Sequence, residues 1–437
     1  MEFTGMVEFE ADNAAKRSAA RRAPAPAARA GCLAGLLVAS VLAGCATVDN
    51  PSAPPTPVEP LEVATTELPE SDVLNVNIVR FDANVPSDPE FKQVELVFTD
   101  VRAAEARYVP YTLRSTLQQS GYWGDVRVVP SRMPGAELEV TGRILDSHGE
   151  TLEVAVRAQD AAGRVWLDRT YNETINEPRY RISSDNNEDP FQSLYNRIAN
   201  DLLAARRKLD TTAKREIAEV ARLQFAAELA PEVYGPRLET GRNGLISPAP
   251  AAGPDPLAGP IDEARRRDAR MVDILDQHYS DFHDRMEVPY GDWREASYRE
   301  MQNLKELRRQ ANTRKALGAL AILGGLFGAF ESDSDLGQFA SQVAIVGGIY
   351  AVASGIDKGR QTSIHIESLR ELGQSLERDL EPMVLDVKDK TVRLTGSAEA
   401  QYAQWREILG EMVAEQQQLI EQDAAERTSA QAAADTR

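Results

Sequence analysis

Between residues 71 and 209, apolar positions alternate with polar ones in several short segments, which predicts strands. The expected strands cover residues 76–79, 94–98, 126–129, 138–145, 152–158 and 165–171. Turns that carry Gly149 and Gly163 separate the later segments. We therefore expect the last four strands to form an antiparallel meander.

Two helices are predicted within the same region. Pro110 fits the first turn of a helix that ends at Gly121, and Asp189-Pro190 has the residues of a helix start, with Asp189 as the cap. After this start, apolar residues recur at three-to-four spacing, which predicts a face that covers the sheet. That face consists of Phe191, Leu194, Tyr195, Ile198 and Leu202.

The second half of the chain has the spacing of helices. A helical run over 211–228 is followed by a Pro/Gly-rich linker that ends at residue 260, where we place a domain boundary. A helical region over 261–315 follows, and residues 357–425 predict a helix, a β-hairpin over 384–395 and a last helix from Ala398. Residues 426–437 are expected to form a disordered tail. The fold class is thus α+β: a sandwich-like α/β domain with a mostly antiparallel sheet, then a mainly helical half.

Residues 316–356 form an unusual apolar segment inside the helical half. Its two uncharged runs, 316–330 and 336–356, are separated by the acidic residues of 331–335, which predicts a helical hairpin. Glycines repeat along both runs, and small residues four apart let two helices approach closely. The glycines expected to pack at a membrane or oligomer interface are Gly318, Gly324, Gly325, Gly328, Gly347, Gly348 and Gly355.

Three interpretations of this hairpin stay open. It inserts into a membrane, although the first run spans only about 22 Å of a ~30 Å hydrocarbon core. It forms the close-packed centre of a homo-oligomer, or it is an ordinary buried hairpin. A glycine inside a soluble helix costs ~1 kcal/mol relative to alanine, so this many glycines favour the first two interpretations.

The N-terminus has the parts of an export signal. Basic residues precede a short apolar run over 32–42, and Leu42-Ala43-Gly44 leads directly to Cys45. This motif resembles the lipobox of bacterial lipoproteins. The resemblance implies cleavage after residue 44, a diacylglycerol on the Cys45 thiol, and a further acyl chain such as palmitate on its amine. By the same resemblance, Ala46 favours sorting to the outer membrane, with the protein on its periplasmic face.

Two details of the N-terminus stay open. Residues 31–44 could form an uncleaved signal anchor, but the apolar run is shorter than the ~20 residues that span a bilayer. Acidic residues precede the basic ones, which is unusual for an export signal. A start of translation downstream of Met1, for instance at Met6, is therefore an alternative. Residues 45–70, with six prolines between 51 and 69, are expected to be the lipidated cysteine and an extended, Pro-rich tether.

Charge and cysteine content narrow the function. The chain carries a net charge of −19, and removal of residues 1–44 leaves about −20, so phosphate repulsion disfavours nucleic acid as a partner. Cys32 and Cys45 are the two cysteines, and the mature chain would retain only the lipidated one. We therefore expect neither a disulfide nor a free thiol.

Two further resemblances concern the envelope. The order of helix, short strand and two long strands over residues 75–205 resembles the periplasmic lipoproteins of ABC-type transporters and the N-terminal domain of TolB-like proteins. Val392 to Ser397, leading into a helix, resembles half of a BON domain, a module associated with phospholipid contact. These resemblances imply docking to envelope components and bring no catalytic motif.

Candidate chemistry is sparse. His278 and His283 lie five apart, which does not place them on one helix face as zinc ligands, and no phosphate-binding loop or nucleophile motif occurs. We expect no catalytic residue, metal or cofactor. The function expected is that of a non-enzymatic envelope lipoprotein, an accessory or scaffold subunit with unidentified envelope partners that forms homo-oligomers. The alternatives are a subunit of an oligomeric outer-membrane export channel, or a periplasmic hydrolase that uses carboxylates.

Overall fold

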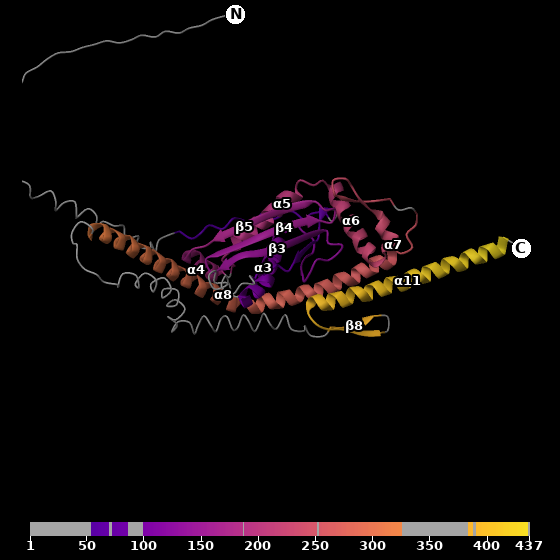
Figure 1. The fold of residues 1–437 in the computed structure, drawn as a ribbon. Helices are drawn as coiled ribbons and strands as arrows, with labels where there is room; N and C mark the ends of the chain where they lie inside the picture. Colours follow the sequence, from indigo (N-terminus) through magenta and orange to yellow (C-terminus); the bar gives the residue numbers. More distant parts are fainter. Residues whose placement is uncertain are drawn as a thin grey trace, which may run out of the picture. The chain divides into compact units, whose positions relative to one another are not determined.

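The computed structural model describes residues 54–69, 72–85, 99–186, 188–250, 253–325, 383–387 and 390–435. The α+β class expected from the sequence is confirmed, because a mixed sheet of five strands packs with several helices (Figure 1). The strands of this sheet are β1 (Val76–Val79), β2 (Val126–Val129), β3 (Leu138–His148), β4 (Thr151–Asp160) and β5 (Val165–Thr174). The helices around it are α3 (Thr99–Ser120), α4 (Glu177–Asn186), α5 (Gln192–Arg206) and α6 (Thr211–Leu229).

The later elements are mostly helical. They are α7 (Pro231–Tyr234), η2 (Gly235–Arg237), β6 (Leu238–Thr240), β7 (Ile246–Pro248), α8 (Ala258–Gly325), β8 (Met383–Val387), β9 (Lys390–Leu394) and α11 (Ala398–Asp435). The segment expected to be a linker before residue 260 thus contains two short helices and the β6–β7 pair. The hairpin predicted over 384–395 and the helix from Ala398 are confirmed as β8, β9 and α11.

The strand order is β2-β1-β3-β4-β5. β3, β4 and β5 form the expected antiparallel meander, but β2 does not join it, because β1 lies between β2 and β3 and pairs parallel with both. The prediction of a four-strand meander is wrong at this point. The reason is that α3 lies between β1 and β2 in the chain, so a parallel crossover can place them side by side.

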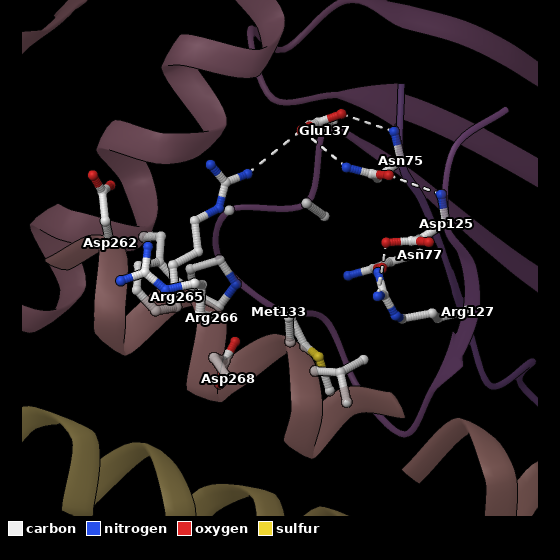
Figure 2. A pocket seen from close by; sticks show the side chains of 16 residues that line it. Asn75, Asn77, Asp125, Arg127, Met133, Glu137, Asp262, Arg265, Arg266 and Asp268 are labelled. Atoms are coloured by element: carbon white, nitrogen blue, oxygen red, sulfur yellow. Dashed lines mark hydrogen bonds and ion pairs between the residues drawn. The ribbon is translucent and has the colours of Figure 1, made fainter. Parts of the chain in front are cut away.

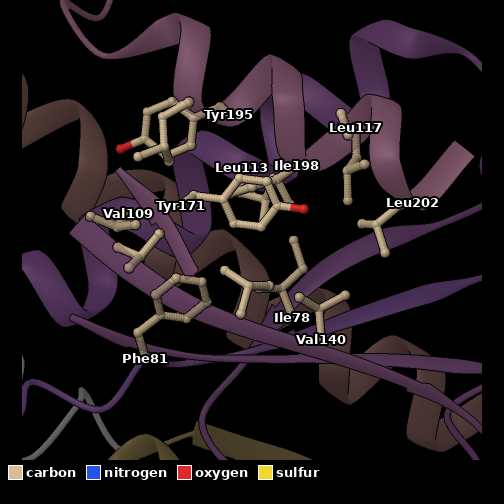
Figure 3. Packing of buried hydrophobic residues seen from close by; sticks show 14 of the residues in the cluster. Ile78, Phe81, Val109, Leu113, Leu117, Val140, Tyr171, Tyr195, Ile198 and Leu202 are labelled. Atoms are coloured by element: carbon tan, nitrogen blue, oxygen red, sulfur yellow. The ribbon is translucent and has the colours of Figure 1, made fainter. Parts of the chain in front are cut away.

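The main hydrophobic core lies between one face of the sheet and the helices α3 and α5. Ile78 and Val140 from the sheet contact Leu113 from α3 and Ile198 from α5 within one cluster (Figure 3). The apolar face predicted for residues 191–202 is confirmed, since every one of its members is buried there. The strand β4 alternates between buried and half-buried residues, as expected for a sheet with only one face against the core.

The start of α3 was predicted wrongly. The helix begins at Thr99 and contains Pro110 in its interior, rather than starting near the proline. A proline inside a helix leaves the carbonyl four residues earlier without its usual donor. Here the backbone N–H of Phe81 donates to the carbonyl of Ala106 over 2.9 Å, which satisfies it. The predicted end at Gly121 is confirmed, with a φ of +69° that suits glycine.

Three further differences concern the helices: the start of α5, the presence of α4 and the end of α11. α5 begins at Gln192, and the Asp189 carboxylate accepts from the backbone N–H of Phe191 at 2.8 Å, before the helix rather than as its cap. α4 was not predicted, because its sequence lacks an apolar stripe. α11 continues through Asp435, where a disordered tail was expected from residue 426; the alanine, glutamine and glutamate residues there are strong helix formers. The strand expected over 94–98 lies outside the described residues.

Candidate functional site

A polar hollow of about 480 Å³ opens between the sheet, α6 and the first turns of α8 (Figure 2). The sheet side contributes residues beside β1 and β2, and the segment before β3 forms the floor. α8 contributes the opposite wall. Its polar and charged lining residues are Asn75, Asn77, Asp125, Arg127, Glu137, Asp262, Arg265, Arg266 and Asp268.

Glu137 organises the sheet side of this hollow. Its carboxylate accepts from the backbone N–H of Asn75 at 2.7 Å and from the Asn75 side chain at 3.2 Å. The Asn75 side-chain oxygen in turn accepts from the backbone N–H of Asp125. Arg265 of α8 reaches the same carboxylate across the hollow, at 3.4 Å. Glu137 is thus a buried acid that joins two strand ends to α8, and its oxygens are occupied.

Most other charges around the hollow are also paired. Arg127 binds Asp125 at 2.9 Å and Asp273 at 2.6 Å, and Arg266 binds Glu263. Burial raises the pKa of Asp268, and this effect outweighs the opposing contributions of Arg406 and Tyr402 from α11. Positive and negative side chains therefore lie next to one another around the hollow, and their charges largely cancel.

Two side chains in the hollow are available for a ligand. The side chains of Asn77 and Asp262 line the hollow without a hydrogen bond to another described residue, and the charge of Asp262 contributes to the raised pKa of Arg222 on α6. An amide and a carboxylate of this kind can bind a small polar or cationic group. Within the described ranges, no three His, Cys, Asp or Glu residues come together as a metal site would require. The residues of the hollow are therefore suited to binding a polar group, and they point to no particular reaction.

A second polar cluster lies buried between α3, the β3–β4 turn and α8. Arg294 of α8 binds Asp189 at 3.0 and 3.2 Å, and the side chains of both are at most 5% exposed. The guanidinium also lies over the ring of Tyr290, 4.4 Å from its centroid. Opposite charges placed this close in a buried site satisfy each other, and removal of one leaves the other buried without its partner.

Glu105 extends this cluster. Its side chain is fully buried, and it accepts from Ser147 at 2.5 Å and from Tyr290 at 2.8 Å, while Arg102 lies 3.4 Å away. Burial raises the pKa of the Glu105 carboxyl, against the opposing effects of Arg102 and the two hydroxyls. Since these groups are buried and bind one another, we assign the cluster to the attachment of α8 rather than to ligand binding.

α8 also covers the edge of the sheet. The strand β2 is an edge strand, so its outer N–H groups have no strand partner. Asp276 of α8 accepts from the backbone N–H of Val128 at 2.8 Å and binds Arg114 of α3 at 2.6 Å. The Asp276 carboxylate thus supplies a partner for the edge strand and holds α8 against α3.

The residues predicted as sites from the sequence are not brought together in the described structure. Cys45 lies outside the described residues, as do Gly328, Gly347, Gly348 and Gly355. Gly318, Gly324 and Gly325 lie in the last turns of α8, so the first ten residues of the apolar segment are helical. Among the helices that the structure describes, none is both long and apolar enough to cross a membrane.

The hollow and the buried cluster were missed from the sequence. Asp189 was predicted only as a helix cap, and Glu105, Glu137 and Arg294 look like ordinary surface charges in the sequence. A search of models of known protein families and of curated protein sequences found no match for this chain. The function is therefore argued from the residues themselves.

Proposed function

We propose that this protein is a lipid-anchored, non-enzymatic scaffold of the bacterial envelope, held at the outer membrane through Cys45. The observation that carries the proposal is the tripeptide Leu42-Ala43-Gly44 placed directly before Cys45, at the end of a short apolar run. Acylation at this cysteine would hold the protein stably, because two or more chains are enough for lasting membrane attachment.

The attachment of α8 supports the scaffold part of the proposal. The helix is fixed to the α/β domain through Asp276, Tyr290 and Arg294, and it continues to Gly325 with Pro289 in its interior and a bend along its course (Figure 1). At 1.5 Å per residue, the 68 residues of α8 measure about 100 Å along the helix axis. A docked protein at one end could therefore be coupled mechanically to the apolar segment at the other.

The lipid anchor is tested by replacing Cys45 with serine in the full-length protein. Mass spectrometry of the native protein should find an N-terminus at Cys45 that carries acyl chains. The Cys45→Ser variant should retain residues 1–44 and carry no acyl mass, whereas Cys32→Ser, which changes the other cysteine, should be processed normally. A native protein that is soluble, unacylated and still bears residues 1–44 would overturn the proposal.

An export-channel subunit is the second candidate, favoured by the small residues Ala321 and Gly325, four apart on the final helical turns of α8. Chemical cross-linking in intact envelopes separates the two functions. A scaffold should give heterogeneous products with other envelope proteins, which affinity purification from gently solubilised envelopes would identify. A ladder that stops at a single ring-sized homo-oligomer would favour the channel.

A further inference from the structure

Part of the proline-rich segment expected to be an extended tether lies along the α/β domain in the described structure. Residues 54–69 form no helix or strand, yet their main chain is bound by side chains of the domain at several points. Asn176, just before α4, donates to the Pro54 carbonyl at 2.8 Å and accepts from the Thr56 N–H at 3.1 Å. This part of the expected tether thus lies on the domain, and it has the extended conformation without helix or strand that its composition predicts.

Three residues of α5 continue the same pattern. Ser193 accepts from the N–H of Glu59 at 3.1 Å, and Asn196 donates to the carbonyl of the same residue at 2.7 Å. Asn200 accepts from the N–H of Glu62 and donates to the carbonyl of Pro60, both at 2.9 Å. An asparagine amide can satisfy one donor and one acceptor of a main chain at once.

The bound main chain has a period of three. Side chains of the domain bind the N–H groups of Thr56, Glu59 and Glu62, and the half-buried side chains of Val58, Leu61 and Ala64 recur at the same interval. The period ends at Ala64, whose N–H donates to the main-chain carbonyl of Ser120 at 2.8 Å. Three residues per turn is the period of the polyproline II helix. Leu61 packs against the main hydrophobic core, so the side of the segment that faces the domain also makes apolar contacts.

The dimensions of the two partners match. Ser193, Asn196 and Asn200 are spaced three and four apart, so they lie on one face of α5. The rise of α5 between the first and last is about 10 Å, while a polyproline II chain advances about 9 Å between Glu59 and Glu62. Proline has no N–H to donate. The prolines of this segment lie at other positions than the residues whose N–H groups are bound, so they are compatible with a site that binds every third N–H.

We propose that Asn176, Ser193, Asn196 and Asn200 form a binding site for polyproline II chains, with residues 54–62 as its occupant, and that this site sets the distance between the domain and the lipid. The second part rests on the lipidation proposed above. With the segment bound, residues 46–53 alone separate Cys45 from the domain, a reach of at most ~30 Å. Release of residues 54–62 would extend that reach to about 65 Å, because the N–H of Ala64 still donates to the carbonyl of Ser120.

Hydrogen exchange on the full mature chain tests the binding site. In the native protein, the amides of Glu59 and Glu62 should be protected. Asn200→Ala removes two hydrogen bonds and should raise exchange at Glu62 about tenfold, and the double variant with Asn196→Ala should raise it further and include Glu59. The matched control is Asn172→Ala on β5, whose side chain bonds Glu153 and not the segment.

Unchanged protection in the double variant, or an absence of protection in the native protein, would overturn the binding site. Exchange in β3 and β4 shows whether each variant is still folded. This experiment does not depend on acylation, so its result stands whether or not Cys45 carries lipid.

Fluorescence transfer on vesicles tests the distance. Because the mature chain would have no thiol besides Cys45, an Arg242→Cys variant can carry a single donor dye, with acceptors on the lipid headgroups. Transfer should be lower for the Asn196→Ala/Asn200→Ala variant than for the Asn172→Ala control. Equal transfer would show that the site does not set the distance, whereas a chain without acyl mass would refute the lipid anchor and leave the exchange result intact.

Discussion

At the scale of single residues, many side chains in this protein serve the main chain of a distant segment. Glu137 binds the N–H of Asn75, and Asp276 binds the N–H of Val128. The N–H of Phe81 takes the place of the donor that Pro110 cannot supply. A buried main-chain polar group without a partner is costly, so each of these contacts fixes where two segments meet.

Gly149, in the turn between β3 and β4, lies directly against the backbone of α8. A methyl group on its Cα would overlap the backbone of Arg294 and Tyr298, and backbone cannot rotate away as a side chain can. We expect Gly149→Ala to lower the free energy of unfolding by ~1–3 kcal/mol. Urea denaturation followed by circular dichroism measures this change.

The matched control is Gly291→Ala on α8, where the added methyl meets nothing within 4 Å. Alanine in place of a helical glycine should raise the free energy of unfolding by roughly 0.5–1 kcal/mol. Opposite signs for the two substitutions are therefore expected. Equal effects of the same sign would show that α8 does not pack on the β3–β4 turn.

His283 gives the attachment of α8 a dependence on pH. Its ring stacks on Tyr108 at 4.3 Å, and burial lowers its pKa below the usual 6.5, against the opposing effects of Asp189, Glu287 and Asp284. The unfolded chain therefore binds a proton at a higher pH than the folded chain does. The stability that neutral His283 contributes is present above pH 6.5 and is lost as the pH falls below it.

His283→Phe should remove this dependence while keeping the ring contact. Between pH 7.5 and 5.5, the native protein should lose about 1 kcal/mol more unfolding free energy than the variant. Glu105, whose pKa burial raises, shifts stability in the other direction, but it is present in both proteins and cancels in the comparison. Parallel pH profiles for the two proteins would contradict the assignment.

At the scale of elements, α8 decides how the helical half joins the domain. It packs on α3 through Phe282, Met286 and Trp293, and it closes the edge of β2 through Asp276. The buried pair of Arg294 and Asp189 lies beside this apolar contact. The helix is therefore held by packing and by charge at neighbouring positions, which makes its placement specific.

Asp189→Asn tests the charge contribution, because asparagine keeps an oxygen for the N–H of Phe191 but leaves Arg294 buried without a counter-charge. We expect a loss of ~3–5 kcal/mol in the free energy of unfolding. Asp168→Asn is the control, since its pair with Arg157 is exposed and should contribute no more than about 1 kcal/mol. If denaturation shows similar losses of unfolding free energy in the two variants, the pair of Arg294 and Asp189 does not act as a buried ion pair that holds α8.

Prediction from the sequence succeeded where local pattern decides the structure. The alternation in β4, the apolar face of α5 and the φ of Gly121 each depend on a few neighbouring residues. It failed where a distant partner decides. The interior Pro110 is tolerated because of Phe81, and β2 leaves the meander because β1 offers it a parallel edge.

The candidate site was beyond prediction for the same reason. Glu137 and Arg265 are 128 residues apart in the chain, and only the packing of α8 brings them to one hollow. The asparagines that bind the proline-rich segment did leave a signal, since Ser193, Asn196 and Asn200 repeat on the polar face of an amphipathic helix. That signal is indistinguishable from ordinary surface polarity until an extended segment is found beside it.

At the scale of the whole molecule, the proposed anchor and the apolar segment would both act at the membrane, so their contributions must be separated. Exporting the protein with a cleavable secretory signal in place of residues 1–45 removes the lipid and leaves the apolar segment. We expect this form to stay with membranes during alkaline carbonate extraction. Gly347→Glu should release it, because a charge in the centre of a bilayer costs ~3 kcal/mol or more and a larger side chain disrupts close helix packing.

Ser334→Glu is the matched control, since it adds the same charge between two aspartates in the acidic sequence that separates the two apolar runs. This control should remain in the membrane fraction and keep the assembly size of the parent in size-exclusion chromatography. If the form without lipid is itself released by carbonate, and Gly347→Glu leaves its assembly size unchanged, the hairpin neither enters lipid nor joins subunits. The segment would then be internal core, and membrane attachment would depend on the acyl chains at Cys45 alone.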